Sequence, residues 1–173
     1  MGKIIFVTGG ARSGKSKFAL KLAKKFGKKV IFLATGLPKD REMEIRIKIH
    51  QKSRPKDWRT IVEEKDVLKA IKGIKDSFCR LLLIDCLTLF VSNLLLADKK
   101  EKEILTEVRN IVKLLRKAKY TTIIVSNEVG DGVVPVNKLA RRFRDVAGLA
   151  NQTVAENADE VYLAVAGIPI KVK

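Results

Sequence analysis

The chain has 173 residues, a length that fits one domain and excludes a second large one. Its 46% hydrophobic and 32% charged residues exclude a disordered or collagen-like chain, and its 2 cysteines are too few for a disulfide scaffold. The formal net charge is +17, and the first 60 residues hold 17 of the 36 basic residues but only 4 of the 19 acidic ones. We therefore expect an anionic ligand on that side, unless the excess is lysine enrichment of a heat-adapted surface.

Short β-branched runs alternate with longer helical patterns, which is typical of βαβ units and a largely parallel sheet. Residues 3–7 form the first expected strand and residues 30–34 the second. Between them, residues 14–26 carry apolar side chains at every fourth position up to Phe26, which predicts a helix. Gly27 is expected to mark the end of that helix.

Residues 43–50 are ambiguous. Met43, Ile45, Ile47 and Ile49 alternate with polar residues, a period of two that favours a half-buried strand. Asp40 is a plausible N-cap, and the composition also tolerates a helix. The periodicity taken alone predicts a strand here.

The remaining elements continue the alternation. Further strands are expected at 58–62, 81–84, 121–125 and 161–165, and the apolar positions from Ile104 to Leu115 mark one long amphipathic helix. Pro135 fits the first turn of another helix. Gly167 is expected to turn the chain into a last strand, 168–172, that pairs antiparallel with its predecessor at the sheet edge.

No apolar run approaches the roughly 20 residues of a membrane span, and the basic start lacks the apolar core of a signal peptide. These features predict a cytoplasmic protein without a membrane span. No Cys/His spacing is typical of a zinc site.

The strongest motif follows the first strand and opens the first helix. It fits the phosphate-binding pattern G-x-x-x-x-G-K-[ST] and consists of Gly9, Gly10, Ala11, Arg12, Ser13, Gly14, Lys15 and Ser16. Glycines let backbone N–H groups turn toward phosphate oxygens, and the helix N-terminus adds a partial positive charge. Lys15 is expected to contact the β- and γ-phosphates of a nucleotide, and the Ser16 hydroxyl to bind Mg²⁺.

Two carboxylates follow later strands. Asp85 comes directly after four aliphatic residues, so we expect it at the carboxyl end of its strand, where α/β proteins bind ligands, as a second ligand of Mg²⁺. Simple termination of the strand is the alternative. Glu128 occupies a similar position after residues 121–127 and could orient a nucleophile or water, or have no role in catalysis.

His50 is the single histidine, and four cationic side chains surround it in the sequence, at Arg46, Lys48, Lys52 and Arg54. Such a field lowers the pKa of an imidazole, favours its neutral nucleophilic form and attracts phosphate. An inert surface histidine is the alternative that the residues alone leave open.

Taken together, these motifs resemble the adenosylcobinamide kinase / adenosylcobinamide-phosphate guanylyltransferase family. The resemblance is carried by Gly9 to Ser16, Ala34-Thr35-Gly36, Glu42-Met43 with Arg46-Ile47 and His50, Arg54-Pro55 with Trp58, Ser126 to Gly130, Val134-Pro135, Leu139-Ala140-Arg141, Phe143-Arg144-Asp145, Gly148, Asn151-Gln152, Ala158 to Val161 and Gly167-Ile168. These blocks in this order span nearly the whole chain and are far more specific than the phosphate loop alone.

The resemblance implies one P-loop NTPase domain over residues 1–173, with a mostly parallel, doubly wound, RecA-like sheet flanked by helices and a C-terminal antiparallel edge hairpin. It implies a bifunctional enzyme that assembles the nucleotide loop of cobalamin. Such enzymes phosphorylate adenosylcobinamide with ATP or GTP. They then transfer GMP from GTP, through a covalent GMP-histidine, to adenosylcobinamide phosphate, which gives adenosyl-GDP-cobinamide and pyrophosphate.

The resemblance also implies residue roles. His50 matches the guanylylated histidine, and the segment that bears it is helical in the family. The family's nucleotide contacts match Ala34, Thr35, Gly36, Gln51, Lys52, Ser53, Arg54, Glu63 and Asp85. It further implies a homo-oligomer, specifically a trimer, with Mg²⁺ as the metal.

Two other classes of function are weighed against this one. A P-loop kinase of a small metabolite would perform phosphoryl transfer alone, with His50 as a bystander. A nucleic-acid binder would use the basic first third, but the aromatic content of 6% and the absence of any RNA-binding signature argue against it.

Overall fold

The computed structural model describes residues 2–38, 41–52, 54–129 and 131–173, and within these ranges it leaves out the side chains of residues 43, 46, 50 and 76. The described strands are β1 (Ile4–Gly9), β2 (Val30–Ala34), β3 (Arg59–Val62), β4 (Leu81–Asp85), β5 (Thr121–Val125), β6 (Glu160–Val165) and β7 (Ile168–Lys171). The described helices are α1 (Lys15–Lys24), α2 (Arg41–Lys52), α3 (Val67–Lys72), α4 (Leu87–Leu96), α5 (Glu101–Lys117) and α6 (Lys138–Asn157), with a 3-10 turn η1 (Asp76–Phe78).

The strands form one sheet in the order β3-β2-β4-β5-β1-β6-β7. Every neighbouring pair is parallel except β6 and β7, which pair antiparallel as a hairpin at the edge. The predicted architecture, including the edge hairpin, is confirmed. Because the central strands are parallel, their carboxyl ends meet at one edge, where Asp85 lies in register between Ala34 and Val125.

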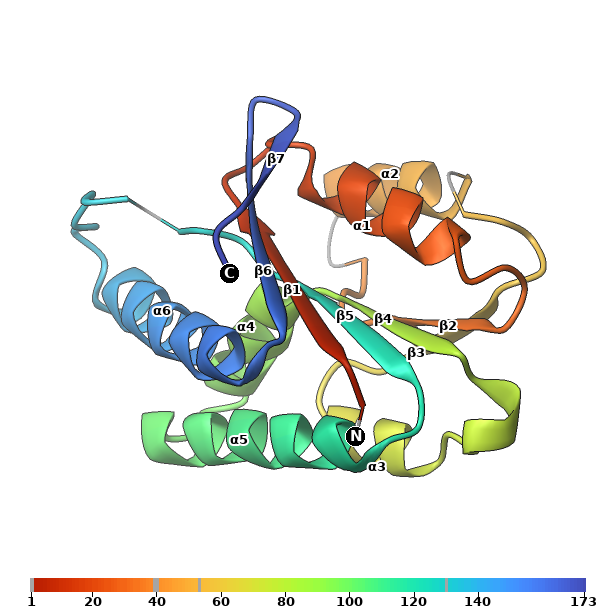
Figure 1. Cartoon of the computed structure of the whole chain (residues 1–173). Coiled ribbons are helices and arrows are strands. Elements are labelled where there is room, and N and C mark those ends of the chain that lie inside the picture. The colour runs from red at the N-terminus through yellow and green to blue at the C-terminus, as the bar shows by residue number, and fades with distance from the viewer. Residues whose placement is uncertain (1, 39–40, 53, 130) are drawn as a thin grey trace.

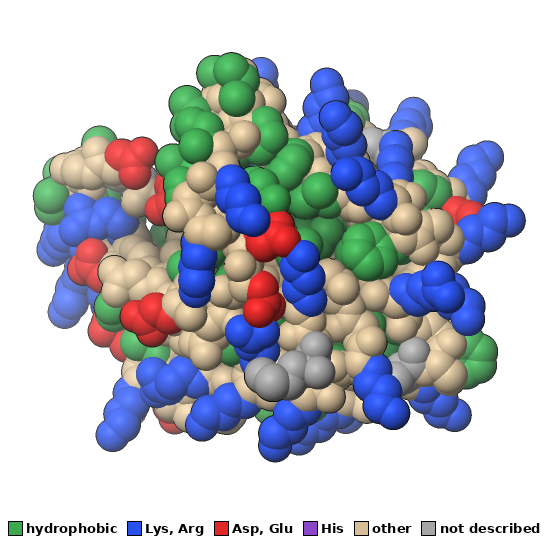
Figure 2. All heavy atoms as spheres, in the orientation of Figure 1, with side chains coloured by type: hydrophobic (Ala, Val, Ile, Leu, Met, Phe, Trp, Pro, Cys, Tyr) green, Lys and Arg blue, Asp and Glu red, His purple; other side chains and the backbone are tan. Residues whose placement is uncertain are grey.

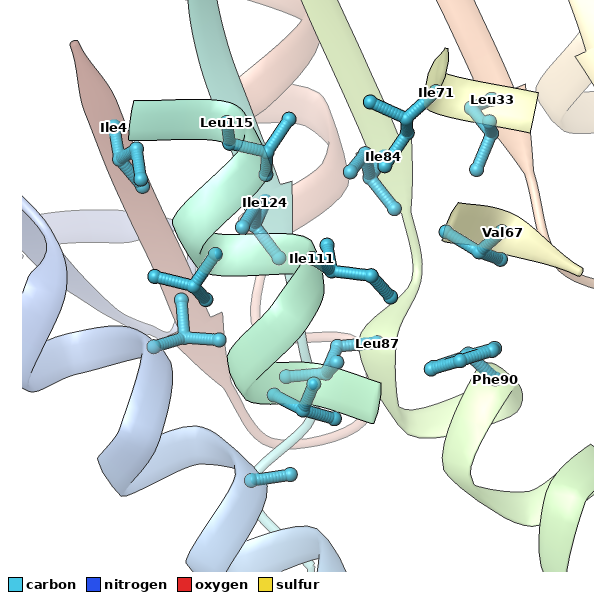
Figure 3. Packing of buried hydrophobic residues seen from close by; sticks show 14 of the residues in the cluster. Ile4, Leu33, Val67, Ile71, Ile84, Leu87, Phe90, Ile111, Leu115 and Ile124 are labelled. Atoms are coloured by element: carbon cyan, nitrogen blue, oxygen red, sulfur yellow. The ribbon is translucent and has the colours of Figure 1, made fainter. Parts of the chain in front are cut away.

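Helices cover both faces of the sheet (Figure 1). α1 packs on one face against apolar side chains of β1, β2, β4 and β5, and α3, α4, α5 and α6 pack on the other. Figure 3 shows this second layer, where Ile111 and Leu115 of α5 lie over Ile84 and Ile124 of the sheet. Strands buried on both faces need continuous apolar sequence, which explains why β1 and β4 show no alternation.

Residues 43–50 lie in α2, so the strand that the periodicity alone predicts is wrong, and the helix that the family resemblance implies is confirmed. β2 pairs with β3 on one side and with β4 on the other. The segment that follows β2 in the sequence therefore cannot pair with β2 as a further strand. An ion pair of 2.6 Å between Glu44 and Lys48, one turn apart, supports the helix. The proposed N-cap, Asp40, lies outside the described residues.

Two further expectations need correction. Pro135 precedes α6 instead of lying in its first turn, because the Asn137 side chain caps the helix by accepting a hydrogen bond of 3.0 Å from the Ala140 N–H. The helix expected at 14–26 is shorter, since α1 ends at Lys24 and Gly27 lies two residues beyond its cap. No helix among the described residues is long and apolar enough to cross a bilayer.

Candidate nucleotide site

The phosphate-binding motif forms the turn between β1 and α1. Gly14 is the N-cap of α1 and has a φ of +90°, a left-handed conformation that favours glycine. A Cβ at Gly14 would lie 2.9 Å from the Cα of Gly167, in the turn of the edge hairpin. The Gly167 N–H also donates a hydrogen bond of 2.9 Å to the Ser13 carbonyl, so the hairpin turn supports the loop from outside.

Lys15 lies inside this turn. Its side chain is buried, and its Nζ donates a hydrogen bond of 3.0 Å to the Gly10 carbonyl. Burial lowers the pKa of Lys15, while the neighbouring Cys86 and Asp85 act in the opposite direction. The ammonium group is therefore held within the loop, with little water around it, where an anion would meet it.

Asp85 occupies the predicted position at the end of β4, and the peptide bond that follows it, to Cys86, is cis. Burial lowers the pKa values of both Lys15 and Arg54. The negative charge of the nearby Asp85 carboxylate acts in the opposite direction, but its effect is smaller than that of burial. Burial also raises the pKa of the Cys86 thiol to about 12, so this cysteine stays protonated. Asp85 is thus an acidic group between two cations at the carboxyl edge.

Arg54, two residues beyond the end of α2, lies near Asp85 at the carboxyl edge of the sheet. Its guanidinium lies over the ring of Phe32 in β2, 3.4 Å from the ring centroid. Its Nε is buried and has no hydrogen-bond partner among the described residues. Such an unsatisfied donor, beside a carboxylate, suits a ligand that supplies an oxygen.

A second polar cluster lies where β5 ends. The Glu128 N–H donates a hydrogen bond of 3.1 Å to the Gly9 carbonyl, and its carboxylate accepts hydrogen bonds from the Thr8 hydroxyl and, at 3.3 Å, from the Asn151 amide. Ser126 joins the cluster by donating a bond of 2.6 Å to Asn151. Glu128 is therefore fixed against the first residue of the phosphate loop.

Two residues predicted to bind nucleotide are engaged within the fold. The fully buried Thr35 hydroxyl donates to the Cys86 carbonyl at 2.7 Å and accepts from the Cys86 N–H at 2.8 Å, which ties β2 to β4. The Glu63 carboxylate accepts hydrogen bonds of 2.9 Å from the N–H groups of Lys65 and Asp66, just before α3. Those bonds lower the pKa of Glu63.

The other residues predicted to bind nucleotide lie in two places, at the end of β2 and at the end of α2. Ala34 is the last residue of β2 and Gly36 lies two residues beyond it, where a Cβ would be 2.9 Å from the Leu89 side chain of α4. Gln51 and Lys52 are exposed at the end of α2. The position of His50 lies in the same helix, but its side chain, like the whole of Ser53, falls outside the described residues.

Within the loop itself, Ala11 and Arg12 are exposed, and Arg12 has a φ of +56°. The buried Ser13 hydroxyl has no partner among the described residues.

The donor set fits a P-loop magnesium ion. Ser16 stands in the first turn of α1 and Asp85 at the end of β4, one hydroxyl and one carboxylate. Mg²⁺ at such sites keeps several waters and binds phosphate oxygens, so it needs few protein ligands. The described residues contain no group of three or more His, Cys, Asp or Glu that could hold a metal ion by themselves.

Sequence reasoning missed the network behind these side chains. The Thr88 hydroxyl of α4 lies 3.0 Å from the Ser126 hydroxyl and accepts a hydrogen bond of 2.7 Å from the Asn127 N–H. Asn93, also in α4, donates to the Thr35 carbonyl at 2.8 Å. Polar residues in the otherwise apolar helix 87–96 were the available signal, since buried polar groups need partners.

Comparisons with known proteins show what this chain is similar to. The family model for "Cobinamide kinase / cobinamide phosphate guanyltransferase" matches residues 5–172. The bifunctional adenosylcobalamin biosynthesis protein CobP of Pseudomonas aeruginosa is 42% identical over 167 residues, which cover 96% of this chain and 95% of that protein. The corresponding CobU proteins of Escherichia coli and Salmonella typhimurium are 38% and 39% identical, each over 98% of this chain and 99% of their own.

Solved structures share the fold at low sequence identity. A KaiC-like protein from Pyrococcus horikoshii superposes with a TM-score of 0.55 at 16% identity, over 94% of this chain and 70% of that one. The RadB recombinase superposes with a TM-score of 0.57 at 17% identity, over 94% and 74% of the two chains. These likenesses support the P-loop fold alone.

Proposed function

The chain belongs to the cobinamide kinase / cobinamide phosphate guanyltransferase family, and from this premise we propose that its single P-loop domain, residues 1–173, carries out two successive transfers. The first phosphorylates adenosylcobinamide. The second attaches GMP to adenosylcobinamide phosphate.

In the first step the γ-phosphoryl group of ATP or GTP passes to the aminopropanol hydroxyl of adenosylcobinamide. The bond from the γ-phosphorus to the β,γ-bridging oxygen breaks, a bond to the hydroxyl oxygen forms, and the hydroxyl proton is released. Phosphoryl transfer of this kind depends mainly on positioning and charge stabilisation. The burial of Lys15 beside Gly10 and the turn at Gly14 support this role for the loop. Glu128, held by Thr8 and Asn151, stands where it could orient the acceptor hydroxyl.

In the second step a nitrogen of His50 attacks the α-phosphorus of GTP. Pyrophosphate leaves, and a phosphoramidate joins GMP to the histidine. The phosphate of adenosylcobinamide phosphate then attacks the same phosphorus, which frees the histidine and gives adenosyl-GDP-cobinamide. Covalent catalysis replaces one three-body encounter with two displacements.

The cations near α2 suit this chemistry. Arg54, with its unsatisfied Nε, and the exposed Lys52 would offset charge that develops on phosphate oxygens. Ser16 and Asp85 would hold Mg²⁺, which, when bound, neutralises charge on the phosphates. The remaining residues of the proposed nucleotide site are Gln51, Ser53, Ala34, Gly36, Thr35 and Glu63. Thr35 and Glu63 act through the backbone that their side chains fix.

We also propose a homo-oligomer, a trimer by resemblance to the family, that works in the cytoplasm. β7 is the edge strand of the sheet, and its hairpin carries exposed apolar residues at Val165, Ile168, Ile170 and Val172. Figure 2 shows apolar side chains gathered over the hairpin. An exposed apolar edge strand of this kind is a ready surface for a second copy of the chain.

The family match over residues 5–172, together with the loop geometry, is the observation that carries the proposal. Incubation with GTP labelled at the α-phosphate tests it. We expect an acid-labile, base-stable label on the wild-type protein and none on His50→Ala. The absence of label on both proteins, with phosphoryl transfer intact, would favour the small-metabolite kinase instead. Tight, salt-sensitive RNA binding without turnover of cobinamide would favour the nucleic-acid binder.

A further inference from the structure

The amino edge of the sheet, at the opposite ends of the strands from the phosphate loop, carries a row of cations. Lys3 precedes β1, Lys29 precedes β2 and Arg80 precedes β4, while Lys119 lies two residues before β5. These four strands are neighbours in the order β2-β4-β5-β1, and all of them are parallel, so their amino ends meet at one edge. Figure 1 shows this edge where the chain enters β1 from the N-terminus, at the other end of that strand from the turn into α1.

These four cations line a single hollow of about 490 Å³. Small-molecule sites generally have volumes of about 300–1,000 Å³, so the hollow is large enough for a ligand. The buried Tyr120 and the half-buried Phe26 also line it and give it partly apolar walls. All four cationic side chains are exposed, so they are available to a ligand that enters from solvent.

Backbone hydrogen bonds fix the spacing of the cations. The Arg80 N–H donates a bond of 2.8 Å to the Lys29 carbonyl, and the Thr121 N–H donates a bond of 3.0 Å to the Arg80 carbonyl. Val30 and Leu81, the next residues along β2 and β4, are register partners. Lys29 and Arg80 therefore lie side by side at the start of neighbouring strands, which are about 4.8 Å apart.

Three of the four cations lack an acidic partner. In the described part of the chain, Lys29, Arg80 and Lys119 form no ion pair, whereas Lys3 is paired with Glu160 at 2.5 Å. Like charges on neighbouring strands repel each other, so this arrangement costs stability unless an anion occupies the hollow. Heat adaptation of the surface does not explain it, because adapted surfaces organise their charges into ion-pair networks and these three cations belong to none.

We propose that this hollow binds a small anion that carries two or more phosphoryl groups, at a site separate from the phosphate loop. Three unpaired cations complement the several charges of a diphosphate or triphosphate better than the one or two charges of inorganic phosphate. The volume admits such a chain with or without a nucleoside attached. Strands of five and six residues separate the hollow from the carboxyl edge by about 15–20 Å, so one ligand cannot occupy both sites. The inference stands independently of the proposed function.

Titration calorimetry with inorganic tripolyphosphate tests the inference. All proteins carry Lys15→Ala, so that the phosphate loop contributes little to binding. The hollow variant Lys29→Gln/Arg80→Gln removes the neighbouring pair of cations. Its matched control, Lys102→Gln/Arg109→Gln, removes one lysine and one arginine at exposed positions of α5 that do not line the hollow. We expect the Kd to rise about 10-fold or more in the hollow variant and to change less than about twofold in the control.

Thermal unfolding of the same proteins gives a second measurement. Because the paired cations repel each other, the hollow variant should melt no lower than its parent without ligand, and it should lose most of the rise in Tm that tripolyphosphate gives the parent. ATP and GTP then identify the source of the phosphoryl groups. Tighter binding than tripolyphosphate would support a nucleotide as the ligand, and weaker binding would support a free inorganic chain.

Four results would overturn the inference. They are no binding of tripolyphosphate to the parent, equal weakening in the hollow variant and the control, inorganic phosphate bound as tightly as tripolyphosphate, and RNA bound more tightly than tripolyphosphate with affinity lost in the hollow variant alone. The second result would assign binding to the overall charge of the chain, and the last would make this edge a nucleic-acid surface.

Discussion

Substitution of Gly14 by alanine tests whether the edge hairpin and the phosphate loop form one unit. An alanine would have to adopt a φ of +90°, which costs about 1–2 kcal/mol. Its Cβ would also lie 2.9 Å from the Gly167 Cα, too close for backbone atoms that cannot rotate away. Moving the hairpin turn would break the 2.9 Å bond from Gly167 to Ser13, worth about 0.5–1.5 kcal/mol. The expected loss in free energy of unfolding is therefore about 2–3 kcal/mol.

Gly27→Ala provides the matched control. Gly27 also has a left-handed φ, +70°, but a Cβ there meets no atom within 4 Å, so only the conformational cost of about 1–2 kcal/mol applies. Urea unfolding gives both free energies, and fluorescent-nucleotide titration gives both affinities. We expect Gly14→Ala to lose more stability and most of its nucleotide binding, and Gly27→Ala to bind normally. Equal losses of stability with equal affinities would refute the coupling of hairpin and loop.

Three further substitutions probe the fold around the site. Burial favours the neutral form of Asp159, but the 2.7 Å bond from the Ile4 N–H and the pairing with Arg116 outweigh it and lower its pKa. This carboxylate therefore stabilises the fold above its unfolded pKa of about 3.9, and the benefit disappears as the pH falls through the lower folded pKa. Urea unfolding should show Asp159→Asn about 1 kcal/mol less stable at pH 7, allowing for partial exposure, with a difference that shrinks as the pH falls below the unfolded pKa; a constant difference would contradict this. Glu63→Gln should cost about 1 kcal/mol by thermal unfolding, because a neutral amide accepts the two N–H bonds before α3 less strongly; no change would argue that Glu63 contributes nothing there. Thr35→Val leaves both Cys86 backbone groups unsatisfied and should cost about 2–4 kcal/mol by urea unfolding, and an unchanged free energy of unfolding would contradict the role of Thr35 in joining the ends of β2 and β4.

The parts of the fold that depend on local sequence were predictable. The aliphatic run before Asp85 identified both a buried strand and its carboxyl end, because a charge interrupts such a run only where the sheet stops. The glycine pattern before Lys15 identified the loop, since its backbone geometry depends on residues without a side chain. Gly167 identified the hairpin for the same reason.

What depends on tertiary contacts was not predictable. The alternation of residues 43–49 suggested a strand, and only the occupied neighbours of β2 explain why a helix forms. α4 is apolar on almost every side, so it has no helical period to detect. The link between Arg54 and the ring of Phe32 joins positions 22 residues apart in the sequence, and no spacing rule connects them.

In the proposed mechanism the phosphate loop binds the triphosphate of GTP, and His50 of α2 attacks the α-phosphorus of that same nucleotide. Mass spectrometry of the protein after incubation with GTP and Mg²⁺, with the modified peptide sequenced, tests it most directly. We expect wild-type protein to gain the mass of one GMP at His50, and Lys15→Ala to gain none, because it cannot hold the triphosphate. GMP on another residue, or undiminished GMP on His50 in Lys15→Ala, would contradict the account.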